Sequence, residues 1–401
     1  MARRLATLLA LLALLSACTA PPPTATATPS PTHDPAALNV TALLDLSGSR
    51  SPKGEAQQNA LQLWVDQQQN RSVTPRLKLR IVDLAGSDAR LFIELHRIAE
   101  EDLADAVIIG VAVGPDETLF RAIELLKRPV LFTVPMKDPV GRGPGGGWTF
   151  GLAPTPRQIA AVDRTLLPAG PLAGAVSAII VSDGSTAAVR ERTALEAEFA
   201  ARGGTVPTVL QIPNTERDTF PERLRPALAV SVALYFTGPT GTYLTPTRLL
   251  PSPSATTGFV TVLSFLTDAV DLGQLRDAAP VTRWPGTRNI VVGQYDPTTA
   301  TGAARAGFGR AYGDRHGPPT TQAALAYDAI GLLAYTAERV GADPERLRER
   351  IESGTFAGIA TSYAFTSSRH AGFDASDLVL LAWDGSQPTL GRPAFAIPKE
   401  R

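Results

Sequence analysis

The sequence predicts an α/β protein built from two similar lobes, and three observations lead to this prediction. Short buried strands alternate with amphipathic helices from residue 38 to about residue 134, which is typical of a parallel sheet covered on both faces. The same alternation restarts near Ala175, after a Gly-rich interruption. A long helical block at 298–353 then follows, which we explain by a return of the chain to the first lobe. About three segments would therefore cross between the lobes, as in a hinge.

The first half of the chain gives the clearest pattern. A short apolar run ends at Leu44, and a hydroxyl-rich turn through Ser47 leads to a helix around Trp64. Residues 77–82 alternate apolar and charged side chains, which indicates a half-exposed or edge strand. Further expected elements are a helix at 89–103, a strand at 106–111, a helix at 119–127 and a strand at 129–134.

The second half repeats this order and then departs from it. Strands are expected at 175–181, 205–212, 230–236, 258–263 and 290–295, and helices at 188–202, 220–228, 298–315, 321–340 and 344–353. We expect the segments 359–365 and 377–383 to close the fold as a hairpin.

The first 37 residues are not expected to belong to the fold. Two arginines precede an apolar run that is too short to span a bilayer, as in a signal peptide. The run ends in Leu-Ser-Ala before Cys18, which resembles the lipobox of bacterial lipoproteins, where the cysteine is lipidated. We therefore expect a lipoprotein signal peptide at 1–17 and a disordered Pro/Thr/Ala tether at 18–37. A secretory signal with a chance cysteine is the alternative.

Composition excludes several classes of protein. The chain has 38 Lys and Arg against 38 Asp and Glu, and it has no basic stripe, so nucleic acid is not an expected partner. A single cysteine allows no internal disulfide. No metal site is expected, because the four histidines are scattered: His33, His96, His316 and His370.

Enzyme motifs are absent from the sequence as well. We find no nucleophile elbow, no H-E-x-x-H and no dinucleotide fingerprint in a strand–helix turn, so we expect no enzymatic activity and no cofactor. The Gly-rich segment 141–147 lacks the Lys-Ser/Thr ending of a phosphate-binding loop. We interpret it as a surface loop.

Three sets of motifs carry a resemblance to a known family. Leu46-Ser47-Gly48 with Gly54, Asn59-Ala60 and Val65-Asp66 follows the first strand; Tyr327-Asp328-Ala329-Ile330 lies in an Ala-rich helix; Phe356-Ala357-Gly358 leads to Tyr363-Ala364-Phe365 and Gly372. In this order they resemble the branched-chain amino-acid-binding family, the type I solute-binding proteins of bacterial ABC importers. The order of elements agrees from about Leu38 to Trp383.

The resemblance implies two Rossmann-like lobes joined by three crossover segments, the type I periplasmic binding protein fold. The first lobe would comprise 38–150 and 297–365, and the second 151–296 and 366–401. The protein would be a monomer that captures a small polar solute, an amino acid or an analogue, between its lobes for an ABC permease. Cys18 would anchor it to the cell membrane on the outer side. A lipoprotein that presents solute to a separate signalling partner is the alternative.

Candidate solute contacts follow from position in this fold. In the first lobe they are Ser47, Gly114, Asp116, Thr133, Lys137 and Phe150, with Trp148 as an alternative wall. In the second lobe they are Asp183, Gly238, Thr240 and Asp268, with Ser264 beside the last. An amino acid needs donors for its carboxylate and an acceptor for its ammonium.

Two of these positions depart from the family pattern, which leaves other small polar solutes open. The loop around Gly114 lacks the family's consecutive hydroxyls and contains an acid, and the segment from Thr133 to Lys137 lacks the usual cluster of small residues. Asp116 and Asp183 could equally cap the helices that follow them. For Asp328, inside an apolar helix, we expect a structural role.

Overall fold

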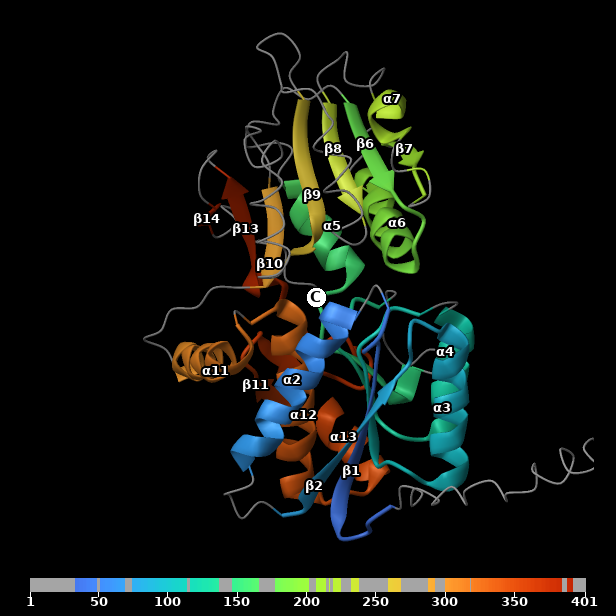
Figure 1. Cartoon of the computed structure of the whole chain (residues 1–401), viewed down its shortest axis with the longest axis vertical. Coiled ribbons are helices and arrows are strands. Elements are labelled where there is room, and N and C mark those ends of the chain that lie inside the picture. The colour runs from blue at the N-terminus through green and yellow to red at the C-terminus, as the bar shows by residue number, and fades with distance from the viewer. Residues whose placement is uncertain are drawn as a thin grey trace, which may run out of the picture. The chain divides into compact units, whose positions relative to one another are not determined.

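The computed structural model contains two separate sheets (Figure 1). It describes residues 33–48, 51–68, 74–113, 116–136, 146–165, 177–201, 207–213, 216, 219–224, 232–237, 259–267, 288–292, 300–317, 319–383 and 388–391. The expected signal peptide, Cys18 and the tether up to residue 32 lie outside these ranges. No helix in the described part of the chain combines the length and apolar character needed to cross a membrane.

The first sheet is five-stranded and wholly parallel, in the order β2-β1-β3-β4-β5. Its strands are β1 (Ala37–Leu44), β2 (Arg76–Asp83), β3 (Ala106–Ile109), β4 (Val130–Phe132) and β5 (Thr149–Gly151). The alternating strand β2 does lie at an edge, as predicted, because only β1 pairs with it in this sheet.

Helices cover both faces of this sheet (Figure 1). They are α2 (Ser51–Gln68), α3 (Asp88–Glu101), α4 (Asp116–Leu126), α11 (Ala300–His316), α12 (Thr321–Val340) and α13 (Pro344–Glu352). Ile108 packs in the same core as α2 and α12, whereas its neighbours Val107 and Ile109 pack in the core with α3 and α4. Successive side chains of a strand point to opposite faces, so strands buried on both sides read as continuous apolar runs.

The second sheet is seven-stranded, in the order β14-β13-β10-β9-β8-β6-β7. Its strands are β6 (Ser177–Ser182), β7 (Thr208–Gln211), β8 (Val232–Thr237), β9 (Phe259–Thr267), β10 (Arg288–Val292), β13 (Leu378–Trp383) and β14 (Pro388–Gly391). The helices α5 (Pro156–Thr165), α6 (Thr186–Ala201) and α7 (Phe220–Leu224) belong to this half, and α5 packs against α6, β9 and β10.

The predicted closing hairpin is wrong. The segment 359–365 contributes β12 (Ser362–Ala364), which pairs with β11 (Thr355–Ala357) instead of with 377–383. The segment 377–383 contributes β13, which pairs antiparallel with β10 and β14. A three-residue strand shows no measurable alternation, so β11 gave no signal in the sequence.

Sequence inspection also missed β5 and α5, although α5 carries a readable start signal. Thr155 Oγ1 accepts from Gln158 N at 3.2 Å, and Gln158 Oε1 accepts from Thr155 N at 2.9 Å. This reciprocal pair is a capping box, and Pro156 at the first helical position favours the same start. The sequence Thr-Pro-Arg-Gln could therefore have located the helix.

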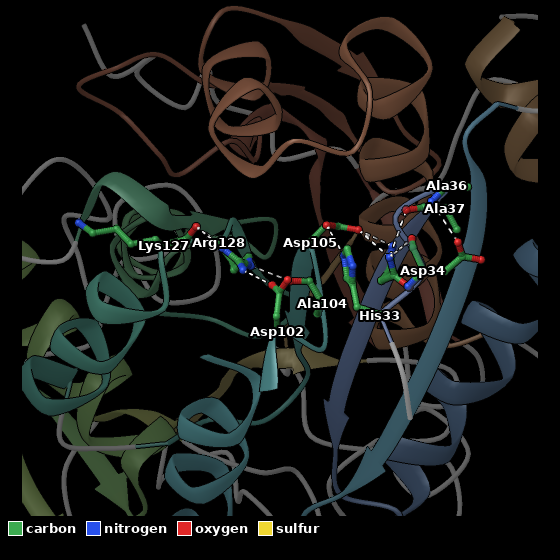
Figure 2. A network of polar contacts seen from close by, with 10 residues as sticks. His33, Asp34, Ala36, Ala37, Asp102, Ala104, Asp105, Lys127 and Arg128 are labelled. Carbon is green, nitrogen blue, oxygen red and sulfur yellow. Dashed lines mark hydrogen bonds and ion pairs between the residues drawn. The ribbon is translucent and has the colours of Figure 1, made fainter. Parts of the chain in front are cut away.

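Polar contacts at the amino ends of β1 and β3 fix the start of the fold (Figure 2). The Asp105 carboxylate accepts from Asn39 N at 2.7 Å and from Asn39 Nδ2 at 3.0 Å, and it lies 3.0 Å from His33 Nε2. Asp34 pairs with Lys78 at 2.7 Å. Residues 33–36, expected in the tether, are thus held against the sheet, and Ala37 already belongs to β1.

The chain segment that follows β5 lies beside the segment that leads to β13. Gly151 N donates to His370 O at 2.8 Å, and Gly372 N donates to Gly151 O at 3.0 Å. Gln158 Nε2 adds a bond to Phe373 O at 3.1 Å. The end of β5 and the segment that leads to β13 are therefore joined by main-chain hydrogen bonds.

His370 holds the same junction from inside. Its ring is fully buried and stacks on Phe150, with centroids 4.3 Å apart. Its Nδ1 lies 2.9 Å from Thr149 O, and its Nε2 lies 3.3 Å from Glu352 Oε1 of α13. A single side chain thus links β5, α13 and the segment before β13.

Asp328 of α12 has the structural role expected for it. Its buried carboxylate accepts from Ile359 N at 2.6 Å, from Ala360 N at 2.8 Å and from the Tyr363 hydroxyl at 2.9 Å. These three bonds hold the turn between β11 and β12. Burial raises the pKa of Asp328 to about 7, although the hydrogen bonds and Arg305 act in the opposite direction.

Because its pKa is raised, Asp328 should make the free energy of unfolding depend on pH. Between about pH 4 and pH 7 the folded state keeps a proton that the unfolded state has released, so this group lowers the free energy of unfolding as pH rises. Asp328→Asn, which loses one acceptor oxygen, should be less stable by roughly 1–3 kcal/mol at pH 5. The deficit should shrink by pH 8, as measured by urea unfolding across pH. A deficit independent of pH would contradict this assignment.

Candidate functional site

The carboxyl ends of β1, β3 and β4 lie next to one another, because these parallel strands are neighbours in the first sheet. Ligands of open α/β sheets bind at such strand ends. Ser47, Gly114 and Thr133 of the predicted set come from the loops that follow these strands. Of these, the structure describes Ser47 and Thr133.

Ser47 is exposed in the turn after β1, and its hydroxyl donates to Asp83 Oδ2 at 2.8 Å. Asp83 Oδ1 accepts from Leu46 N and from Ala85 N, each at 2.8 Å. Burial alone would raise the pKa of Asp83, but these hydrogen bonds outweigh it and hold the pKa below its usual value. The Asp83 carboxylate therefore fixes the loop that carries Ser47.

The first turn of α2 lies directly on the end of β1. A Cβ at Gly54 would stand 1.8 Å from Asp45 O, so only glycine allows this close approach. Asp45 is buried, and its Oδ1 accepts from Gly86 N at 2.8 Å. The loops after β1 and β2 are thereby connected.

Gln57 of α2 joins the ends of the next two strands. Its side chain is fully buried; Nε2 donates to Gly110 O at 3.0 Å, and Oε1 accepts from the Thr133 hydroxyl at 2.5 Å. A Cβ at Gly110 would lie 2.2 Å from Gln57 Oε1, so glycine makes room for the amide. Sequence reasoning missed Gln57, because a glutamine on a helix gives no signal of burial.

Thr133, a predicted solute contact, is only 1% exposed and lies beneath this amide. Its hydroxyl proton is directed at Gln57, so its present role is to hold the loop after β4. Phe150 is likewise fully buried, stacked on His370 and edge-on to Phe365 at 5.5 Å. Its observed contacts are those of a packing residue. Trp148, its alternative, is 6% exposed, with the Arg348 guanidinium 5.1 Å from its ring centre.

Asp183 follows β6 and is buried. Its Oδ1 accepts from Ser185 N at 2.8 Å, and Ser185 Oγ accepts from Ala188 N at 3.3 Å, which shapes the turn into α6. Asp116 is the first residue of α4. Asp183 therefore shapes the turn before α6, whereas the hydroxyl that bonds the first turn of this helix is that of Ser185.

The remaining predicted contacts lie outside the described residues: Gly114, Lys137, Gly238, Thr240 and Asp268. Ser264 belongs to β9, whose side chains are likewise not described. Within the described ranges, no three His, Cys, Asp or Glu side chains come together as a possible metal site.

A family model described as "Periplasmic binding protein" matches residues 37–386, nearly the whole described chain. The chain belongs to the periplasmic binding protein family. The predicted relationship to type I solute-binding proteins of ABC transporters is confirmed. This family comprises extracytoplasmic solute-binding proteins rather than enzymes.

Solved structures support the same fold at low sequence identity. A solute-binding protein of an ABC transporter from R. palustris, in complex with benzoate, has a TM-score of 0.71 at 19% identity, covering 88% of this chain and 95% of that one. A branched-chain amino acid substrate-binding protein from Streptococcus pneumoniae, in complex with isoleucine, has a TM-score of 0.68 at 16% identity, covering 88% and 98%.

A leucine-binding protein from Thermotoga maritima also has a TM-score of 0.68, at 17% identity, covering 88% of this chain and 97% of that one. No curated protein sequence matches this chain. The likenesses confirm the expected fold of two Rossmann-like lobes joined by three crossover segments.

The Gln57 bridge predicts a specific stability defect. Gln57→Leu would leave Gly110 O and the Thr133 hydroxyl buried without their partner, which should cost about 2–4 kcal/mol. The matched control is Gln62→Leu on the same helix, where the exposed amide binds only Asp66. This control should change the free energy of unfolding by less than about 0.5 kcal/mol. Equal effects of the two substitutions in urea unfolding would refute the bridge.

Proposed function

We propose that this periplasmic binding protein is a lipid-anchored receptor that captures a small polar solute, an amino acid or an analogue, for an ABC importer. The observation that carries the proposal is that the carboxyl ends of the neighbouring strands β1, β3 and β4 lie together, with those of β3 and β4 joined by the amide of Gln57. In this fold such strand ends face the solute. Two of the related proteins named above were solved with benzoate or isoleucine, both small carboxylates.

We keep as proposed solute contacts the predicted residues that the structure does not show buried in contacts within the first lobe. Ser47 lies on the loop fixed by Asp83, and Gly114, Asp116 and Lys137 follow β3 and β4. From the second lobe we propose Asp183, Gly238, Thr240 and Asp268.

The lobe boundaries form part of the proposal: 38–150 with 297–365, and 151–296 with 366–401. Sheet membership supports them, because β1 to β5 form one sheet and β6 to β10 with β13 and β14 form the other. The packing of α12 against α2 supports the return of the chain to the first lobe. We further propose that the protein acts as a monomer.

Solute binding predicts a rise in melting temperature. A compound that binds only the folded state stabilises it by about 2.7 kcal/mol at one hundred times its dissociation constant. L-isoleucine, L-leucine, benzoate, further amino acids, amides and short peptides form the panel. At least one should raise the melting temperature by a few degrees. A flat response to every compound at millimolar concentration would count against the receptor function.

The proposed anchor predicts a change of cell fraction. Cys18→Ser removes the only thiol, so the protein should move from the membrane fraction to the soluble fraction. The adjacent substitution Thr19→Ser, which keeps the thiol, is the control and should remain with the membrane. Immunoblots of fractionated cells measure both. Membrane association of the Cys18→Ser protein would disprove lipidation at this position.

A further inference from the structure

Arg190 of α6 makes contacts that belong to neither its helix nor its sheet. Its side chain is 8% exposed. Nη2 donates to Val113 O at 2.6 Å, and Nη1 donates to Pro135 O at 3.3 Å. Val113 lies in the loop after β3, and Pro135 lies in the loop after β4. A helix that packs on the second sheet thus binds two loops of the first sheet.

Both acceptors are main-chain carbonyls. A guanidinium offers several N–H groups in a planar fork, so one arginine can bind two carbonyls at once, whereas an ammonium offers a single compact charge. Hydrogen bonds from a charged donor are also stronger than those between neutral groups. Because the acceptors are backbone atoms, this interaction depends on the positions of the two loops and not on the identity of their side chains.

Gln57 and Arg190 hold the same two loops from different elements. Gln57 binds Gly110 and Thr133, the first residues after β3 and β4, and Arg190 binds the loops two or three residues further on. Gln57 comes from a helix of the first sheet, so its bonds survive any movement between the lobes. The bonds of Arg190 exist only while α6 lies against the loops.

We propose that Arg190 is a positioning residue of the solute site, which fastens α6 of the second lobe to the loops after β3 and β4 and so favours the arrangement that encloses solute. This inference rests on the proposed function. Opening of the lobes would break both bonds together, because one guanidinium makes them.

The test measures the separation of the lobes directly and needs no solute. In the Cys18→Ser full-length chain, which has no other cysteine, Leu125→Cys on α4 and Ala197→Cys on α6 place two nitroxide labels at exposed positions. Pulsed electron–electron double resonance then gives the distance distribution. Arg190→Met keeps an apolar stem but removes both bonds. The Arg190→Met substitution should broaden the distribution of label-to-label distances toward longer values. The ratio of molecules with short distances to molecules with long distances should fall roughly tenfold.

The matched control is Arg192→Met on the same helix, which removes the same charge from a residue that pairs with Glu196 of α6 at 4.0 Å. It should keep the parental distribution. Arg190→Lys, which keeps the charge, should lie between the two and serves as the folded variant if Arg190→Met unfolds. Parental distributions for both Arg190 variants would overturn the proposal. If the Arg190 variants shift the distance distribution while no compound of the panel raises the melting temperature, the positioning role of Arg190 is supported and the receptor function is rejected.

Discussion

The structure depends on how the polar groups at the carboxyl ends of β3 and β4 are satisfied. Gly110 O and the Thr133 hydroxyl are buried at the points where the ladder ends, and one amide from α2 binds both. A buried carbonyl or hydroxyl without a partner costs free energy, so this position of α2 is strongly constrained. The loops that leave these strands therefore start from positions that the Gln57 amide fixes.

A second set of contacts lies where the chain passes between the two sheets. The crossover after β5 and the crossover before β13 are joined through Gly151, His370 and Gly372. Gln158 adds a side-chain hydrogen bond to the same junction, and His370 Nε2 lies 3.3 Å from Glu352 Oε1. These contacts hold the end of β5 and the segment before β13 side by side where the chain passes from one sheet to the other.

The sequence predicted the alternation, the two lobes and the edge strand, because apolar periodicity reports burial directly. It could not predict the pairing of β11 with β12, because each strand has three residues and its turn is held by Asp328, which comes from a distant helix. Among the site residues, Ser47 was placed correctly in the turn after β1. The contacts of Gln57 and Arg190 were missed, since they join residues that lie 53 to 77 positions apart in the chain. Phe150 was predicted by its position as a possible wall of the solute site, and in the structure its ring stacks on the buried His370.

The central claim is that solute binds at the carboxyl ends of the first sheet, on loops held by Gln57. A crystal structure with a compound that raises the melting temperature tests it most directly. We expect density for that compound in contact with the loops after β1, β3 and β4, with the Gln57 amide still bonded to Gly110 and Thr133. Density in another place, such as the crevice beside Tyr335 and Phe356 between α12 and β11, would contradict it.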